Sequence, residues 1–312
     1  MRRKRKKTGT QGDADLICVT GDQHCNSERG LRPPRFYDKE RQEYRHAPRR
    51  VVEDLWEPWL QHADDLRAEK ERLKAEGYNA RVIVAHLGDG VDRNKYDPEG
   101  YEMLSANRTV ITDIGEAALE PLLADDLVDL FIFERGTSGH EGGSGELCEM
   151  LAERISRRAN VWRANERDTW SHYCGRFIFQ GVDVVFSHHP ISRARRFWTR
   201  GNAANRTALH YWMAYNIPLV MRNKVVNQRE PTPDLMFFGH CHFDAQGGGT
   251  STIPLVAVYI PSWQLPYAYI HGLGAGIVPN PVGCKWMRCQ GGRYHLYKTW
   301  LHTPRAQGAV RV

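Results

Sequence analysis

The sequence lacks an apolar run long enough to cross a membrane. No stretch of about 18 consecutive apolar residues occurs, so no transmembrane helix is expected. The basic N-terminal start is not followed by the apolar segment of a secretory signal, because the nearest apolar run, Leu16–Val19, is too short. We therefore predict a cytoplasmic protein with no membrane partner.

A disulfide framework is also missing. The seven cysteines are an odd number and lie scattered along the chain, a pattern that fits a reducing compartment. Cys284 and Cys289 lie close together in sequence, but no second pair accompanies them to complete a zinc site. We interpret them as two unrelated thiols near a strand.

Little net charge remains outside the N-terminus. The formal net charge is +6, and residues 1–7 alone carry six Lys and Arg. Three interpretations of this basic run stay open: a solvated tail, a nucleic-acid-binding arm, or a localisation signal. Residues 1–14 are predicted to be a disordered basic tail, and residues 15–312 a single domain with a helical insertion around residues 31–80.

Apolar runs alternate with helical patterns along the chain. Strands are expected at residues 16–20, 81–87, 127–133, 177–180, 182–187, 235–238, 255–260 and 294–299. Helices are expected at residues 51–76, 115–124, 146–158 and 203–215, and loops at 26–49 and 136–145. This order predicts a layered α/β or α+β architecture with a mixed sheet or a sandwich of sheets.

Carboxylate and imidazole side chains directly follow four of the predicted strands. In chain order they are Asp22 and His24, Asp89 and Asp92, His188 and His189, and His240 and His242. Ligands of open α/β sheets bind at the carboxyl ends of the strands, so these side chains are expected to converge. Aspartate and histidine together suit divalent ions such as Zn, Mn, Fe or Co. Each motif alone could be a turn or a surface loop, but four in this order favour a metal site.

These motifs resemble the ordered signature of the calcineurin-like metallophosphoesterases. That signature reads Asp-x-His, Gly-Asp-x-x-Asp, Gly-Asn-His-Asp/Glu, His-x-Pro and Gly-His-x-His. Four of its five blocks stand at residues 22–24, 88–92, 188–190 and 239–242. The resemblance covers residues 22–242, and it implies a four-layer β-sandwich flanked by helices with a dinuclear metal centre at the strand ends.

The resemblance also implies a ligand for each position of that centre. One ion would be held by Asp22, His24 and His242, the other by His188 and His240, with Asp89 bridging both. Asp92 would orient a ligand imidazole. His188 is preferred to His189 because of the His-x-Pro spacing, and His189 stays a candidate ligand. Two divalent ions, of Mn, Zn, Fe or a similar metal, would activate a bridging hydroxide that hydrolyses a phosphate ester.

The third block departs from the family signature. The stretch after the third strand reads Gly136-Thr137-Ser138-Gly139-His140 and contains no asparagine. This Gly-Thr-x-x-His form is similar to that of phage and prophage members, which implies a phage-encoded protein. His140 is expected to be the general acid that protonates the leaving group. Thr137 is a candidate weak ligand of the second ion, and Asn165 is an outside candidate for the absent amide.

Three functions stay open at this stage. A phosphodiesterase or nuclease is favoured by the basic tail and by the Arg-rich segments 29–50 and 193–200, which could contact phosphate backbones. Trp198 and the pair Tyr211-Trp212 could stack bases, although aromatic residues more often pack in a core. The alternatives are a phosphomonoesterase for small molecules and a non-catalytic nucleic-acid-binding scaffold with a degraded metal site.

Overall fold

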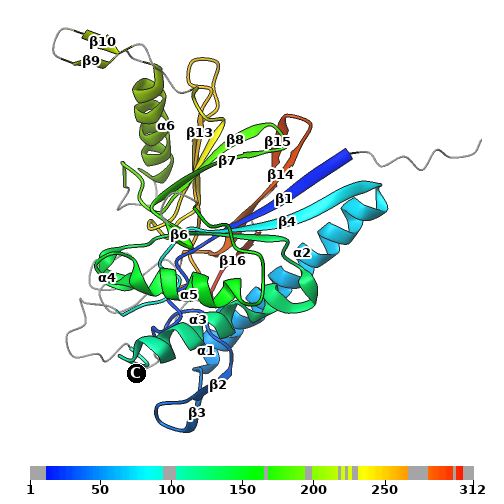
Figure 1. The fold of residues 1–312 in the computed structure, drawn as a ribbon, viewed down its shortest axis with the longest axis vertical. Helices are drawn as coiled ribbons and strands as arrows, with labels where there is room; N and C mark the ends of the chain where they lie inside the picture. The colour runs from blue at the N-terminus through cyan, green and yellow to red at the C-terminus, as the bar shows by residue number, and fades with distance from the viewer. Residues whose placement is uncertain are drawn as a thin grey trace, which may run out of the picture.

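Two β-sheets pack face to face, with helices on both outer sides (Figure 1). The computed structural model describes residues 12–93, 103–164, 168–193, 199–216, 231–265, 280–297 and 300–304, and the backbone of strands β9 (Leu219–Met221) and β10 (Lys224–Val226). Within these residues, no helix has both the length and the apolar character needed to span a bilayer.

The first sheet contains a parallel core of four strands. These are β1 (Gly12–Thr20), β4 (Tyr78–His86), β5 (Leu130–Glu134) and β6 (Ser171–His172), in that spatial order. β14 (Val282–Gln290) pairs with β1 in antiparallel orientation, and β15 (Arg293–Leu296) and β16 (Trp300–His302) both pair with β14. β1 thus lies between two long strands, which accounts for its nearly continuous apolar sequence.

The second sheet has a parallel centre and antiparallel edges. Its spatial order is β12 (Ala245–Gly248), β13 (Val256–Tyr259), β11 (Leu235–Phe238), β8 (Val182–Ser187) and β7 (Cys174–Phe179). β8, β11 and β13 run parallel, whereas β7 and β12 are antiparallel to their neighbours. The strands predicted at residues 177–180 and 182–187 are confirmed, and they form the antiparallel pair β7 and β8.

Alternate residues of β1 face two different cores, as the period of a strand requires. Leu16 and Cys18 belong to the core beneath the helices α2 (Glu57–Ala75), α3 (Arg108–Leu123) and α5 (Glu146–Ser156). Ile17 and Val19 belong to the core between the two sheets, together with Phe186 and Phe237. A third core lies under α6 (Arg200–Asn216) on the outer face of the second sheet.

The layers therefore run helix, sheet, sheet, helix. The predicted fold class, an α/β sandwich of two sheets flanked by helices, is confirmed by these three cores. Each core is formed by the apolar face of one layer packing on the next, which is the usual way in which such elements exclude water.

Several short elements connect the main ones. They are β2 (Arg35–Asp38), β3 (Glu43–His46), α1 (Arg49–Val51), the π-helical turn Val52–Trp56, the 3-10 turn Ala124–Asp126 and α4 (Ser138–Glu141). The segment predicted as a helical insertion around residues 31–80 thus opens with a β2–β3 hairpin in place of the expected loop, and its helical part begins at Arg49.

Two boundaries and one whole strand show the main differences from the sequence prediction. β1 begins at Gly12, because residues 12–14, which were assigned to the tail, pair in parallel with β4. α3 begins at Arg108, seven residues earlier than expected, because the Asn107 side chain accepts a hydrogen bond from the Thr109 amide and caps the helix. β14 was not predicted, since its sequence has no simple alternation, being buried on both faces. Residues 1–11 lie outside the described residues.

Candidate metal centre

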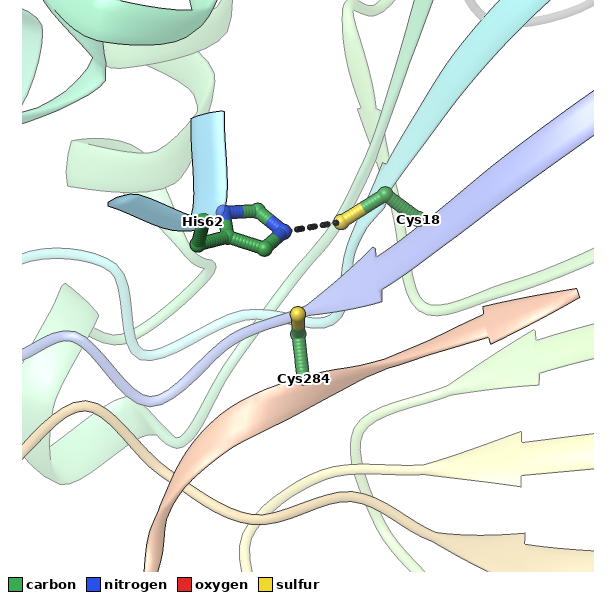
Figure 2. Close-up of side chains that lie close together, drawn as sticks. All are labelled: Cys18, His62 and Cys284. Carbon is green, nitrogen blue, oxygen red and sulfur yellow. Dashed lines mark hydrogen bonds between the residues drawn. The ribbon is translucent and has the colours of Figure 1, made fainter. Parts of the chain in front are cut away.

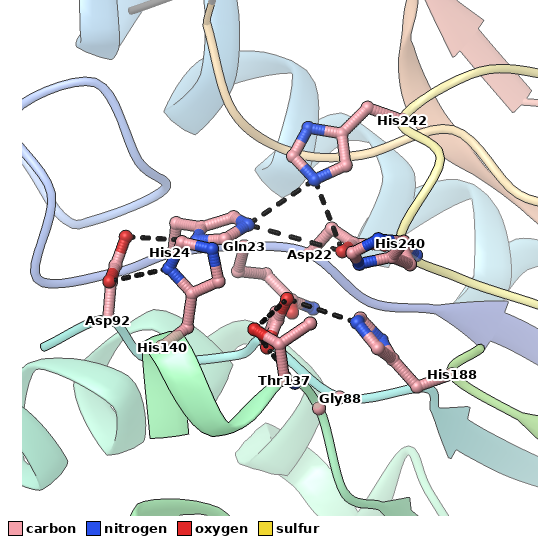
Figure 3. A network of polar contacts seen from close by, with 12 residues as sticks. Asp22, Gln23, His24, Gly88, Asp92, Thr137, His140, His188, His240 and His242 are labelled. Atoms are coloured by element: carbon pink, nitrogen blue, oxygen red, sulfur yellow. Dashed lines mark hydrogen bonds and ion pairs between the residues drawn. The ribbon is translucent and has the colours of Figure 1, made fainter. Parts of the chain in front are cut away.

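The candidate ligands meet at one edge of the sandwich, where parallel strands of both sheets end (Figure 3). Asp22 and Asp89 follow β1 and β4 of the first sheet. His188 and His240 follow β8 and β11 of the second sheet. The two sheets therefore supply carboxylates from one side and imidazoles from the other.

The turns that carry these side chains have unusual backbone conformations. Five candidate ligands have φ between 47° and 65°, in the left-handed region: Asp22, His24, Asp89, His240 and His242. Such conformations are costly for residues other than glycine and concentrate at functional sites. The turns are held by hydrogen bonds between them, from the Asp22 amide to the Gly88 carbonyl and from the His24 amide to the Asp89 carbonyl. The β1 and β4 turns are therefore locked together.

One group of ligands consists of Asp22, His24 and His242. His242 Nε2 lies 3.2 Å from Asp22 Oδ1 and 3.4 Å from His24 Nε2. The ring nitrogens of the two histidines face each other, and one ligand atom from each residue lies within 4.8 Å of the other two. The three residues predicted to hold the first ion are thus close enough to share one.

A second group shares Asp22 with the first. Asp22, Asp89 and His188 are all buried, and one ligand atom from each lies within 4.8 Å of the other two. His188 Nε2 lies 3.0 Å from Asp89 Oδ2. The carboxylate common to both groups is therefore Asp22, whereas the sequence resemblance assigned the bridging position to Asp89.

His240 lies with both histidines of the His188-His189 pair. Ligand atoms of these three residues again lie within 4.8 Å of one another, and the His240 ring centroid is 5.1 Å from each of the other two centroids. His188 is buried and His189 is exposed. His189 thus lies at the outer side of the centre, where it could reach an ion or a substrate.

Two ligand imidazoles have their ring orientation set by a neighbouring acceptor. His188 Nδ1 donates to the Leu87 carbonyl oxygen over 2.6 Å, which turns Nε2 toward Asp89. His24 Nδ1 lies 3.1 Å from Asp92 Oδ2, which leaves Nε2 toward His242. Hydrogen bonds of this kind to the second ring nitrogen are typical of metal-binding histidines.

The buried polar atoms of the centre fit a bound cation. Within the described residues, Asp22 Oδ1 and His188 Nε2 are buried and have no hydrogen-bond partner, although a ring nitrogen and a carboxylate lie 3.2 and 3.0 Å from them. Both atoms belong to groups whose ligand atoms lie within 4.8 Å of one another, so each could serve as a ligand of one ion. Carboxylate and neutral imidazole are also the ligand types that divalent transition metals accept.

The electrostatics of the centre favour positive charge. Burial would raise the pKa of Asp22, but the neighbouring His242 and His188 imidazoles together outweigh burial and lower the pKa to about 2. Burial would lower the pKa of His188, but the charge and hydrogen bond of Asp89 and the charge of Asp22 together outweigh burial and raise the pKa to about 10. The buried carboxylates therefore create a field that a divalent cation would satisfy.

Asp92 links His24 to the predicted general acid. Its Oδ1 atom lies 2.8 Å from His140 Nδ1, and its Oδ2 atom binds His24. Burial would lower the pKa of His140, but the hydrogen bond to Asp92 and the charge of Asp89 raise it to about 9. His140 is therefore protonated at neutral pH and able to donate a proton, as general acid catalysis requires.

Thr137 contacts Asp89 with two donors. Its backbone N–H donates to Asp89 Oδ1 over 2.7 Å, and its hydroxyl lies 3.2 Å from both carboxylate oxygens. The structure thus places Thr137 as a residue that orients Asp89. Asn165, the candidate for the absent amide, lies outside the described residues.

Glu141 is a site residue that the sequence interpretation missed. Its buried carboxylate accepts hydrogen bonds from the Gly136 amide over 2.6 Å and from the Gly90 amide over 3.2 Å. It therefore joins the turn after β5 to the turn after β4 that carries Asp89. A signal was available, because Glu141 follows His140, where the family signature has Asp or Glu.

Gln23 and His86 form a second support beneath the centre. Gln23 Oε1 lies 2.7 Å from His86 Nε2, and both side chains are buried. Burial lowers the pKa of His86 to about 4, so the ring is neutral. Nothing in the local sequence identifies this pair, because Gln23 and His86 lie far apart along the chain.

Comparison with known proteins leaves the family of this chain unassigned. No protein-family model and no curated protein matches it. Among solved structures, vacuolar protein sorting 29 of Cryptosporidium parvum has a TM-score of 0.38 and 10% identity, covering 93% of this chain and 99% of its own. A dimetal phosphatase from Danio rerio has a TM-score of 0.39 and 11% identity, covering 93% and 99%. The 5'-nucleotidase of Candida albicans has a TM-score of 0.37 and 11% identity, covering 89% of this chain and 48% of its own. At TM-scores this low, these structures do not indicate the chemistry of the site, which depends on the residues of this chain.

Proposed function

We propose that this chain is a metal-dependent phosphoesterase of the calcineurin-like type, with a centre for two divalent ions. The observation that carries the proposal is the carboxylate shared by two ligand groups. Asp22 lies with His24 and His242 in one group, and with Asp89 and His188 in the other. A carboxylate between two ligand sets is the arrangement that two-metal hydrolysis of phosphate esters uses.

The ligand atoms divide between two ions. His24 and His242 would hold the first and His188 and His240 the second, with Asp22 contributing to both. Asp89, oriented by Thr137, would complete both sets. Two such ions supply Lewis acidity toward phosphate oxygens and lower the pKa of a coordinated water.

The remaining chemistry belongs to side chains of the chain itself. Asp92 holds the His140 ring through Nδ1, over 2.8 Å, so that the ring cannot turn away from the centre. Because the pKa of His140 is raised to about 9, its proton is available for the leaving oxygen at neutral pH. Thr137 and Glu141 keep the Asp89 carboxylate in place during the reaction.

The proposed substrate is a phosphodiester of a nucleic acid. The first seven residues carry six Lys and Arg, a charge density that favours contact with a phosphate backbone. Arg193 lies close enough to His189 and His240 to lower the pKa of both rings, after the larger effect of burial. A fixed positive charge therefore stands on the exposed side of the second ligand set. Trp198 and most of the Arg-rich segment 193–200 lie outside the described residues.

The Asp89→Asn variant tests the two-ion centre. The amide keeps the shape of the carboxylate but removes its charge, so activity on an aryl phosphodiester is expected to fall on the order of 100-fold or more. The control is Asp126→Asn, an exposed aspartate that shares the left-handed backbone with φ 49°. Wild-type activity in Asp89→Asn would show that this carboxylate does not act in catalysis.

A substrate panel tests the proposed specificity. Single-stranded DNA, duplex DNA, RNA, an aryl diester and an aryl monoester are each offered with Mn²⁺, Zn²⁺ or Mg²⁺. Hydrolysis of nucleic acid and diester is expected. Hydrolysis of the monoester alone would indicate a small-molecule phosphatase, and nucleic-acid binding without hydrolysis or bound metal would indicate a scaffold.

A further inference from the structure

A second cluster of metal-ligating side chains lies in the core beneath the helices (Figure 2). Cys18 from β1, His62 from α2 and Cys284 from β14 point toward one another. All three side chains are completely buried. One ligand atom from each lies within 4.8 Å of the other two. The cluster contains no residue of the centre at the strand ends.

The register of two strands brings the sulfur atoms together. Cys18 is directly opposite Trp286 in the antiparallel β1–β14 pair. Cys284, two residues away on the same strand, therefore lies on the same face as Trp286 and is a diagonal neighbour of Cys18. Helix α2 crosses that face and places His62 over the two thiols. Cys289 belongs instead to the core between the sheets.

The separation of the ligand atoms fits one bound ion. Cys18 Sγ lies 3.4 Å from His62 Nε2. Zinc binds sulfur at about 2.3 Å and nitrogen at about 2.0 Å, so tetrahedral ligands are roughly 3.5 Å apart. The sulfur and nitrogen atoms therefore already have the spacing of neighbouring ligands.

A hydrogen bond indicates which nitrogen of His62 carries the lone pair. Trp286 Nε1 donates to His62 Nε2 over 3.0 Å, so this nitrogen is an acceptor, the state in which histidine binds metals. The same indole N–H also lies within reach of Cys18 and Cys284. It can therefore donate to a metal-bound thiolate once the nitrogen lone pair is engaged.

Tryptophan rings surround His62. Ring centroids of Trp59, Trp263, Trp286 and Trp300 lie between 5.0 and 6.0 Å from the His62 centroid. These large side chains exclude water from the cluster, so its polar atoms must be satisfied by one another or by an ion.

We propose that Cys18, His62 and Cys284 bind a thiophilic divalent ion of the zinc class, separate from the two ions of the catalytic centre. Two thiolates and one neutral imidazole balance the charge of such an ion, and a dry core disfavours any net charge. Thiolate ligands select zinc-like ions over magnesium or manganese. Binding releases the two thiol protons to solvent. The bound ion would tie α2 to β1 and β14, two neighbouring strands of the first sheet.

The test uses the full chain, stripped of metal and reloaded with Co²⁺. Thiolate ligands give a sulfur-to-cobalt charge-transfer band in the near ultraviolet, whereas the nitrogen and oxygen ligands of the catalytic centre do not. We expect this band in the wild type and its loss in Cys18→Ser and in Cys284→Ser. Elemental analysis should show that each of these variants also loses a single zinc ion per chain.

The matched control is Cys289→Ser, which removes a buried thiol from the same strand but from its other face. It should keep the band and the full zinc content. A wild-type chain without the band would overturn the proposal, as would a Cys18–Cys284 disulfide found by mass spectrometry in the freshly purified protein. The wild-type spectrum decides the question even where a serine variant fails to fold.

Discussion

At the scale of single residues, the candidate ligands occupy backbone conformations that aspartate and histidine adopt only at a cost. Left-handed φ values at Asp22, Asp89 and His240 cost on the order of 1 kcal/mol each or more. They persist because buried hydrogen bonds fix the turns, including the one from the His240 amide to Asp22 Oδ2 at 2.9 Å. The strain thus accompanies the close approach of the ligand atoms.

The role proposed for His140 can be tested through the leaving group. In His140→Gln, turnover of an ester with a poor leaving group is expected to fall roughly 10²–10⁴-fold, because the proton donor is lost. An aryl ester with a good leaving group needs no proton and should be affected much less. Metal content should be unchanged, and the exposed His210→Gln serves as control. An equal loss on both esters would contradict the general-acid role.

Glu134 provides a test of pH-dependent stability. It is the last residue of β5, and burial raises the pKa of its carboxyl well above the usual range. The unfolded chain releases this proton near pH 4.3, about the usual pKa of a glutamate, while the folded chain keeps it. The folded state therefore binds more protons, and the free energy of unfolding falls with rising pH, by at most about 1.4 kcal/mol per pH unit. Glu134→Gln should gain stability relative to wild type between pH 5 and pH 8, measured by urea unfolding. A difference in the free energy of unfolding between the two proteins that does not change with pH would refute this prediction.

At the scale of elements, the turns after β4 and β5 are packed so closely that only glycine fits between them. A Cβ atom at Gly136 would overlap Asp89 Oδ1 and the Asp89 amide, whereas a Cβ atom at Gly143 would have nothing within 4 Å. The two glycines belong to the same stretch between β5 and α5, so they form a matched pair for mutation.

Gly136→Ala is therefore expected to displace Asp89 and to lower activity on the order of 100-fold, since small shifts of catalytic groups are costly. Metal affinity, measured by calorimetry with Mn²⁺, should fall in parallel. Gly143→Ala should match the wild type in both measurements. Equal behaviour of the two variants would mean that the Asp89 turn does not need this close contact.

At the scale of the whole molecule, the structure joins a sandwich to a charged N-terminal segment. β1 begins at Gly12, so a truncation that spares the first sheet must stop at residue 11. All six Lys and Arg of residues 1–11 lie within the first seven, so such a truncation removes them without touching a paired strand.

Deleting residues 1–11 tests whether this segment binds nucleic acid. Each phosphate contact contributes about 0.9 to the slope of log affinity against log salt concentration on duplex DNA, so six contacts would contribute roughly 5. In the deletion variant, the magnitude of the slope should be smaller than in the wild type by up to that amount. A variant of equal length with the basic residues changed to Gly and Ser should behave like the deletion. An unchanged slope would exclude the nucleic-acid arm.

The sequence by itself determined the strands that end in ligands and the order of the ligand blocks. A motif such as Asp22-x-His24 and the apolar run before it are adjacent along the chain, so local pattern suffices to find them. The same reasoning predicted the layers, because each run had an apolar face to bury. It failed for β14, whose pairing with β1 depends on a segment more than 260 residues away.

Only the tertiary structure decided which side chains share a ligand set. The position of Asp22 between two groups, the support that Glu141 gives to the Asp89 turn, and the Cys18–His62–Cys284 cluster all join residues that are distant along the chain. Strand register and helix crossing set these contacts, and neither is encoded in a short motif. Cys284 and Cys289 lie on opposite faces of β14, because residues five apart along a strand point to opposite sides, and only the packing shows which core each one joins.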